Sequence, residues 1–107
     1  MRRDRRRIYQ GLVNRLVDGD ARVEQTMAGG IPAMAVQGSF FAGFDAADGS
    51  LVVRLPHQRV VSLVVAGVGH EIEADGAVAA DRVGIDDPVR WEDFAAEALA
   101  FVGHTAA

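Results

Sequence analysis

The sequence predicts an α+β domain, a two-layer α/β sandwich in which helices cover a five-stranded antiparallel sheet, in the order α-β-β-β-α-β-β-α. Short runs of β-branched and aromatic residues, separated by turn residues, fill the stretch from residue 23 to residue 55. Apolar residues recur at helical spacing near both ends of the chain. The turns between consecutive strands are short, which implies antiparallel pairing, and such a sheet buries one face under helices.

Length and composition are typical of one globular domain spanning residues 1–107, with residues 1–4 and 104–107 expected to be frayed. Cysteine is absent, which excludes disulfides, a catalytic thiolate and a cysteine-ligated zinc ion. The apolar runs are too short to span a membrane, and the basic start lacks the apolar core of a secretory signal. We therefore expect a cytoplasmic protein. All eleven basic residues are arginine, which indicates a GC-rich, bacterial source.

The first helix is predicted over residues 4–18, with Gly19 placed to end it. Two apolar series with a spacing of four residues run side by side and form one stripe on this helix. Their members are Ile8, Leu12 and Leu16, and Tyr9, Val13 and Val17.

Three strands are predicted next, joined by turns at Gln37-Gly38 and at Asp45–Gly49. The predicted strands are residues 23–36, with Gly29-Gly30 read as a break or bulge within the first, then Ser39–Phe44 and Ser50–Leu55. In the middle strand Phe40, Ala42 and Phe44 should share one face and Phe41 and Gly43 the other. Aromatic residues on both faces favour a central strand.

Residues 56–66 fit two interpretations. The run of valines favours a strand, whereas Pro56 suits the first turn of a helix and Gly67 its end, which puts helix slightly ahead. A strand is expected at His70–Ala74, because this stretch alternates between apolar and acidic residues. A last strand is expected at Asp81–Ile85.

The last helix is predicted to begin with Asp87 as N-cap and Pro88 in its first position, and to end at Gly103. Trp91, Phe94 and Phe101 lie at the spacing of core residues, so we interpret them as core and not as a platform on which bases stack.

An ordered set of short motifs resembles the TfoX N-terminal-domain family over about residues 20–103. The set consists of Met27-Ala28-Gly29-Gly30, Gly38-Ser39-Phe40-Phe41-Ala42, Leu51–Pro56 with Arg54 near its end, and a C-terminal helix with Trp91 and Ala98-Leu99. Ala28 replaces the usual phenylalanine, and residues 79–83 lack the Met-x-x-(Trp/Tyr) step, so the chain resembles a divergent member. The resemblance implies a fold like that of type III secretion chaperones and YjbR-like domains, with a helix at residues 56–66. It implies structural roles for Met27, Gly29, Gly30, Gly38, Phe41, Arg54 and Pro56, and no chemistry.

Residues that commonly carry chemistry do not form a recognised pattern. The histidines His57, His70 and His104 lack metal-ligand spacing, and Glu71, Glu73 and Asp75 are interpreted as a solvated strand face. No serine lies in a nucleophile-elbow motif, and the glycine pairs match no phosphate-binding loop. We therefore predict no catalytic residue, metal or cofactor, although a pocket combining His57 or His70 with Glu71 or Asp81 would favour an enzyme.

Charge is the remaining functional signal. Residues 1–22 carry seven arginines and three acids, whereas residues 23–107 carry four arginines and twelve acids, for a net charge of −4. Such a body is a poor general binder of nucleic acid. The arginines at the N-terminus have the right charge to contact phosphates. They are Arg2, Arg3, Arg5, Arg6, Arg7 and Arg15.

Two functions follow as hypotheses. The favoured one is a small non-enzymatic regulatory or adaptor module that acts through protein contact, as a homodimer or with a regulator, because sheet edges can pair and catalytic groups are missing. The alternative is a transcription-linked DNA-binding module that uses the arginine-rich helix. No membrane partner is expected.

Overall fold

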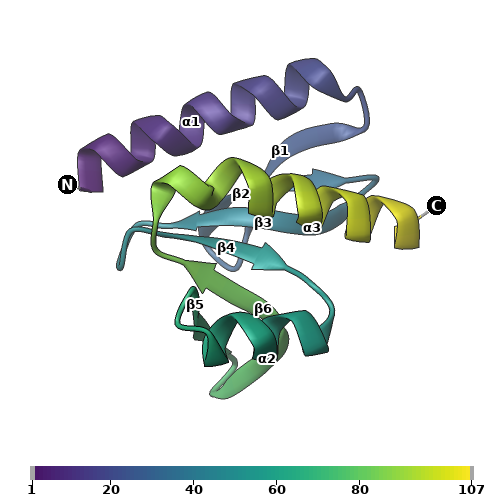
Figure 1. The fold of residues 1–107 in the computed structure, drawn as a ribbon. Coiled ribbons are helices and arrows are strands. Elements are labelled where there is room, and N and C mark those ends of the chain that lie inside the picture. Colours follow the sequence, from purple (N-terminus) through teal and green to yellow (C-terminus); the bar gives the residue numbers. More distant parts are fainter. Residues whose placement is uncertain (1, 107) are drawn as a thin grey trace.

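A computed structural model describes the backbone of residues 2–106 and the side chains of residues 4–104. Three α-helices, a short 3₁₀ helix and six strands follow one another in these residues (Figure 1). Their bounds are α1 Arg2–Gly19, β1 Val23–Ala28, β2 Ile31–Val36, β3 Ser39–Asp45, β4 Ser50–Arg54, α2 His57–Val65, β5 Gly69–Ala74, β6 Ala77–Ile85, η1 Pro88–Arg90 and α3 Trp91–Ala106.

The described strands form a single antiparallel sheet in the order β1-β2-β3-β4-β6-β5. The predicted α+β class and antiparallel pairing are confirmed, but the sheet has six strands where five were expected. The chain crosses from β4 through α2 to the outer strand β5 and then returns as β6 between them. Edge strands are therefore β1 at one end and β5 at the other.

The additional strand comes from Gly29-Gly30, which is a hairpin turn and not a bulge. Both glycines have positive φ, 58° and 85°, which is the backbone conformation of a two-residue type I′ turn. The turn reverses the chain, so residues 23–36 fold into β1 paired with β2 instead of one long strand. Gln37 and Gly38, with φ of 52° and 81°, form the second such turn, as predicted.

A bulge in β3 overturns the predicted faces of the middle strand. Ala35 pairs with Phe40 and Met34 with Ala42, so Phe41 has no partner in the register. The extra residue turns Phe41 toward the helices, where it is fully buried in the same core cluster as Phe44. Phe40 lies on the opposite face, under the guanidinium of Arg82 at 4.7 Å.

The helices pack against one face of the sheet and share one core. In Figure 1, α3 crosses the central strands, α2 lies over the β5–β6 end, and α1 runs beside α3. Tyr9 from α1 stacks on Phe44 at 5.5 Å, and Trp91 from α3 meets the same ring edge-on at 5.9 Å. Trp91 and Phe94 are buried, as predicted.

The helix ends agree with the sequence in most places. Gly19 ends α1, and α2 forms over the ambiguous segment. Asp87 accepts a hydrogen bond from the Val89 N–H at 3.1 Å, but it is the N-cap of η1 and not of the last α-helix. Pro88 is the first residue of η1, and α3 begins three residues later, at Trp91. Gly103 does not end the last helix, which continues to Ala106. Its backbone takes no positive φ, and a Cβ there would make only ordinary contacts, so nothing forces the chain to turn. The backbone of residues 2–4 and 104–106 belongs to α1 and α3, and residues 1 and 107 lie outside the described residues. Fraying of residues 1–4 and 104–107 stays a prediction.

Candidate functional site

The most distinctive surface feature is an apolar groove between α2 and the β5–β6 hairpin. The stripe of valines on α2 is wider than the face that the helix can bury. Val60 is buried together with Leu63, whereas Val61 and Val65 are 45% and 82% exposed. Across the groove, Val78 on β6 is 52% exposed. An apolar surface therefore lies open to solvent along the length of α2.

Strand lengths explain why the groove exists. β4 pairs with β6 only as far as Arg54 opposite Arg82, so residues 77–81 of β6 project beyond the end of β4. The Leu55 N–H donates to the Asp81 carbonyl at 3.0 Å, and the chain then turns into α2. Helix and hairpin diverge from this point and leave a hollow of about 330 Å³ between them. It is lined by His57, Val60, Val61, Val64, Val65, Glu71, Val78, Ala79 and Ala80.

His57 and Glu71 both line this groove, but they do not form a visible acid–base pair. The Nδ1 of His57 is 2.8 Å from the Ala80 carbonyl, which can only accept, so this nitrogen donates. His57 thus fastens the first turn of α2 to β6. The lining of the groove is mainly valine and alanine.

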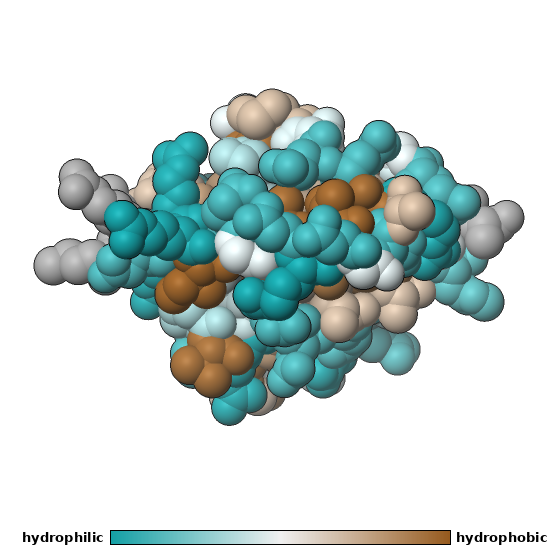
Figure 2. All heavy atoms as spheres, turned by 90° about the horizontal axis from the view of Figure 1, so that it is seen from above, coloured by the Kyte–Doolittle hydropathy of each residue, from teal (hydrophilic) through white to brown (hydrophobic). Residues whose placement is uncertain are grey.

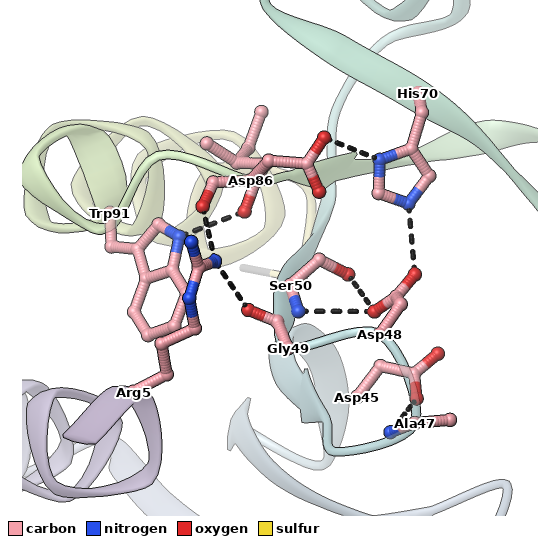
Figure 3. Close-up of polar contacts among 10 residues, drawn as sticks. Arg5, Asp45, Ala47, Asp48, Gly49, Ser50, His70, Asp86 and Trp91 are labelled. Carbon is pink, nitrogen blue, oxygen red and sulfur yellow. Dashed lines mark hydrogen bonds and ion pairs between the residues drawn. The ribbon is translucent and has the colours of Figure 1, made fainter. Parts of the chain in front are cut away.

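A polar cluster at the other end of the hairpin joins four segments of the chain (Figure 3). The His70 ring on β5 lies between two carboxylates: Nδ1 is 3.2 Å from Oδ2 of Asp86, and Nε2 is 3.2 Å from Oδ2 of Asp48. Asp48 also accepts from the N–H and hydroxyl of the buried Ser50, at 3.0 and 2.7 Å. The ring lies against Gly84, where a Cβ would be 2.4 Å from Nε2. The position of the His70 ring therefore depends on glycine at residue 84.

Arg5 completes this cluster from the N-terminal helix. Its Nη1 donates to the Gly49 carbonyl at 2.9 Å and to the Asp86 carbonyl (Figure 3). The indole N–H of Trp91 donates to the Ile85 carbonyl at 2.8 Å next to it. These contacts connect α1, the β3–β4 loop, β5 and the segment after β6, so the cluster is a structural junction.

No group of three or more histidine, aspartate or glutamate side chains is arranged to hold a metal ion in the part of the chain that the structure describes. His104 lies in the last turn of α3 and is exposed, apart from the other two histidines. Glu71, Glu73 and Asp75 are exposed on the hairpin, as predicted for a solvated face.

The arginines that sequence analysis grouped together are used in different ways. Arg5 is bonded to the two carbonyls, and Arg15 pairs with Glu92 on α3 at 3.1 Å. Arg6 and Arg7 are exposed on α1. The side chains of Arg2 and Arg3 lie outside the described residues. Figure 2, which views the molecule from the α1 side, shows a mainly hydrophilic surface with separate small hydrophobic groups.

The motif residues on which the resemblance rests form turns, are buried, precede a helix or make a side-chain contact, with one exception. Gly29, Gly30 and Gly38 form turns, Phe41 is buried, and Pro56 precedes α2 with φ −56° and ψ 146°. Arg54 donates through Nε to Asp81 at 3.1 Å. Met27 is the exception, because 64% of it is exposed on the edge strand β1.

The surroundings of Asp20 and of Tyr9 shift the pKa values of these two side chains. Arg22 donates to the Asp20 carboxylate through Nε and Nη2, at 3.1 and 2.8 Å, and through its backbone N–H, at 2.9 Å. The side-chain hydrogen bonds are the main reason that the pKa of Asp20 falls to about 2. Burial raises the pKa of the Tyr9 hydroxyl, which has no hydrogen-bond partner among the described residues.

The sequence matches no protein-family model, and no curated protein or solved structure matches it. The resemblance to the TfoX N-terminal-domain family therefore stays a prediction. None of the helices within residues 2–106 is long and apolar enough to cross a membrane.

Proposed function

We propose that this protein is a non-enzymatic adaptor module that acts through protein contact, and that the groove between α2 and the β5–β6 hairpin is its contact surface. The observation that carries the proposal is the exposure of Val61, Val65 and Val78 around one hollow. Buried aliphatic side chains stabilise a fold, whereas clustered exposed ones mark surfaces that are covered by a partner. The expected occupant is a short protein segment that inserts an aliphatic or aromatic side chain between the helix and the hairpin.

The chemistry of the neighbouring groups supports contact over catalysis. His57 donates to a backbone carbonyl, and His70 lies between Asp48 and Asp86, so both histidines have structural tasks. Glu71 at the rim of the groove offers a partner an acceptor at the edge of an apolar centre. A dry centre with a polar rim is the usual anatomy of a protein interface.

Affinity capture with matched variants tests this proposal. Val65→Asp places a charge in the groove, and Val89→Asp places the same charge on η1, where Val89 is 87% exposed and outside the groove. We expect a protein from the native cell extract to be retained by the wild type and by Val89→Asp, and to be lost with Val65→Asp. Retention that is equal with all three forms, or absent from the wild type, would refute a role for the groove.

A second candidate function is transcription-linked DNA binding through α1. It is favoured by the exposure of Arg6 and Arg7 on a mainly hydrophilic surface (Figure 2). Arg5 donates to backbone carbonyls of the fold, and Arg15 pairs with Glu92 at the surface, which reduces the charge that this helix can offer to phosphates. This candidate therefore ranks below protein contact.

A further inference from the structure

The edge strand β1 lacks the features with which proteins usually protect a sheet edge. It pairs with β2 over six consecutive positions without a register shift, and it contains no proline and one charged residue, Glu24. Residues 24–27 are all exposed. Unprotected regular edges of this kind pair readily with another strand.

The opposite edge of the same sheet is built differently. β5 carries the acids Glu71 and Glu73, and its register with β6 shifts between them. An irregular ladder and inward or edge-placed charges are the devices that prevent pairing. The contrast indicates that an open edge at β1 is a specific property of this end of the sheet.

The β1–β2 turn determines which backbone groups of β1 face outward. Ala28 and Ile31 close a two-residue turn and exchange hydrogen bonds, so Thr26 and Glu24 also bond inward to β2. The N–H and C=O groups of Gln25 and Met27 then face away from the sheet. The Met27 carbonyl has one long contact, 3.5 Å from the Thr26 hydroxyl, and keeps a second lone pair.

Val23 limits where a second strand can be placed. Its N–H donates to the Asp20 carbonyl at 3.0 Å, so it is already used. A register that centres on Gln25 would require this group, and a register that centres on Met27 would pair Gln25 with the glycine turn. A register that centres on Thr26 uses the four outward groups of Gln25 and Met27 and no others.

We infer that β1 binds β1 of a second copy of this chain, antiparallel, about a twofold axis that passes between the two Thr26 residues. Gln25 of each copy then exchanges two backbone hydrogen bonds with Met27 of the other. Glu24 lies opposite Ala28, so the two acids do not face each other. The two sheets become one, with their helix layers on the same side. Gln25 and Met27, whose backbone groups would make these hydrogen bonds, are both exposed residues.

Sedimentation velocity on the full chain, from micromolar to near-millimolar concentration, tests this inference with charge variants at the axis. Thr26→Lys and Thr26→Glu each place like charges directly opposite each other, and we expect each to weaken self-association by about tenfold or more. An equimolar mixture of the two variants should recover dimer at least to the wild-type level. Gln25→Lys is the control, because its side chain faces Met27 and not its own copy, and it should stay within about twofold of the wild type.

Three results would overturn the inference: a wild type that is monomeric at all concentrations, Thr26 variants that dimerise like the wild type, or a mixture that does not recover. Val65→Asp separates this surface from the groove. We expect it to leave self-association unchanged, because Val65 lies at the far end of the sheet. Loss of the dimer in Val65→Asp would show that copies associate through the groove and would also overturn pairing at β1.

Discussion

The contact between Gly84 and His70 gives a substitution whose effect can be worked out from geometry. In Gly84→Ala the new Cβ would lie 2.4 Å from Nε2 and 2.5 Å from Cε1 of the ring, well inside contact distance. The neighbouring residues Val83 and Ile85 are fully buried, so the strand cannot easily move. The ring of His70 must therefore leave its place between Asp48 and Asp86.

Several terms of known size determine the free energy of unfolding of this variant. The two contacts of the His70 ring with Asp48 and Asp86 are lost, and each is worth at most about 0.2–1 kcal/mol because its members are a third to two thirds exposed. Forcing an extra carbon into a packed strand costs about 1–3 kcal/mol. Alanine in place of glycine returns about 0.4–1 kcal/mol by restricting the unfolded chain. We expect a net loss of about 2 kcal/mol.

Urea denaturation of a double-mutant cycle measures this prediction. His70→Ala removes the ring, so Gly84→Ala made in that background should be neutral or slightly stabilising, which gives an interaction free energy of about 2 kcal/mol. Gly11→Ala serves as a control for the substitution itself. Its Cβ has ordinary space in α1, 3.5 Å from Arg15, and we expect a gain of about 0.5–1 kcal/mol. An equal loss from Gly84→Ala in both backgrounds would refute the role assigned to His70.

Three further predictions concern α1 and the turn after it. Tyr9→Phe removes a buried, unpartnered hydroxyl, so urea denaturation at neutral pH should show a gain of about 1 kcal/mol in the free energy of unfolding. Above pH 10.0, the ordinary pKa of the hydroxyl, the wild type should lose further stability and the variant should not. A variant less stable than the wild type would contradict this. NMR titration should give a pKa of about 2 for Asp20 in the wild type and a value closer to 3.8 in Arg22→Gln. The stability that this lowered pKa contributes is present above pH 3.8 and is lost as the pH falls toward 2. An unchanged pKa in the variant would disprove the role of the guanidinium. Fluorescence anisotropy of a labelled duplex tests the DNA candidate: binding at low salt that is weakened by Arg6→Gln with Arg7→Gln would support it, and no binding would retire it.

Local signals were sufficient to predict most elements of the fold. Apolar spacing located α1 and α3, whereas the capping signal at Asp87 and Pro88 marked the start of η1, three residues before α3. The error at Gly29-Gly30 arose because a glycine pair fits both a bulge and a type I′ turn, and only the pairing of residues 23–28 with 31–36 distinguishes them. The bulge at Phe41 depends on its partner strand in the same way.

The surfaces were harder to predict than the elements. The valine stripe of α2 was visible in the sequence, but the fraction that stays exposed depends on how far β6 projects beyond β4. The sequence signal for an exposed apolar surface was a stripe of valines on α2 that is wider than one helix face can bury. The hydrogen bonds of Arg5 could not be predicted, because its acceptors are the backbone carbonyls of residues 49 and 86. Every residue has a backbone carbonyl, so the sequence does not indicate which ones accept.

The separation between Arg5 and those acceptors has a consequence for folding during synthesis. The Arg5 side chain donates to the carbonyl of Asp86, 81 positions later. Tyr9 and Trp91 both contact the ring of Phe44. The ribosome adds about 5–20 residues per second, so residue 86 is synthesised several seconds after α1. In that time the strands from residue 23 to residue 54 can already pair, and Tyr9 can already contact Phe44. The contact between α1 and the carbonyl of Asp86 is thus among the last contacts of the domain to form.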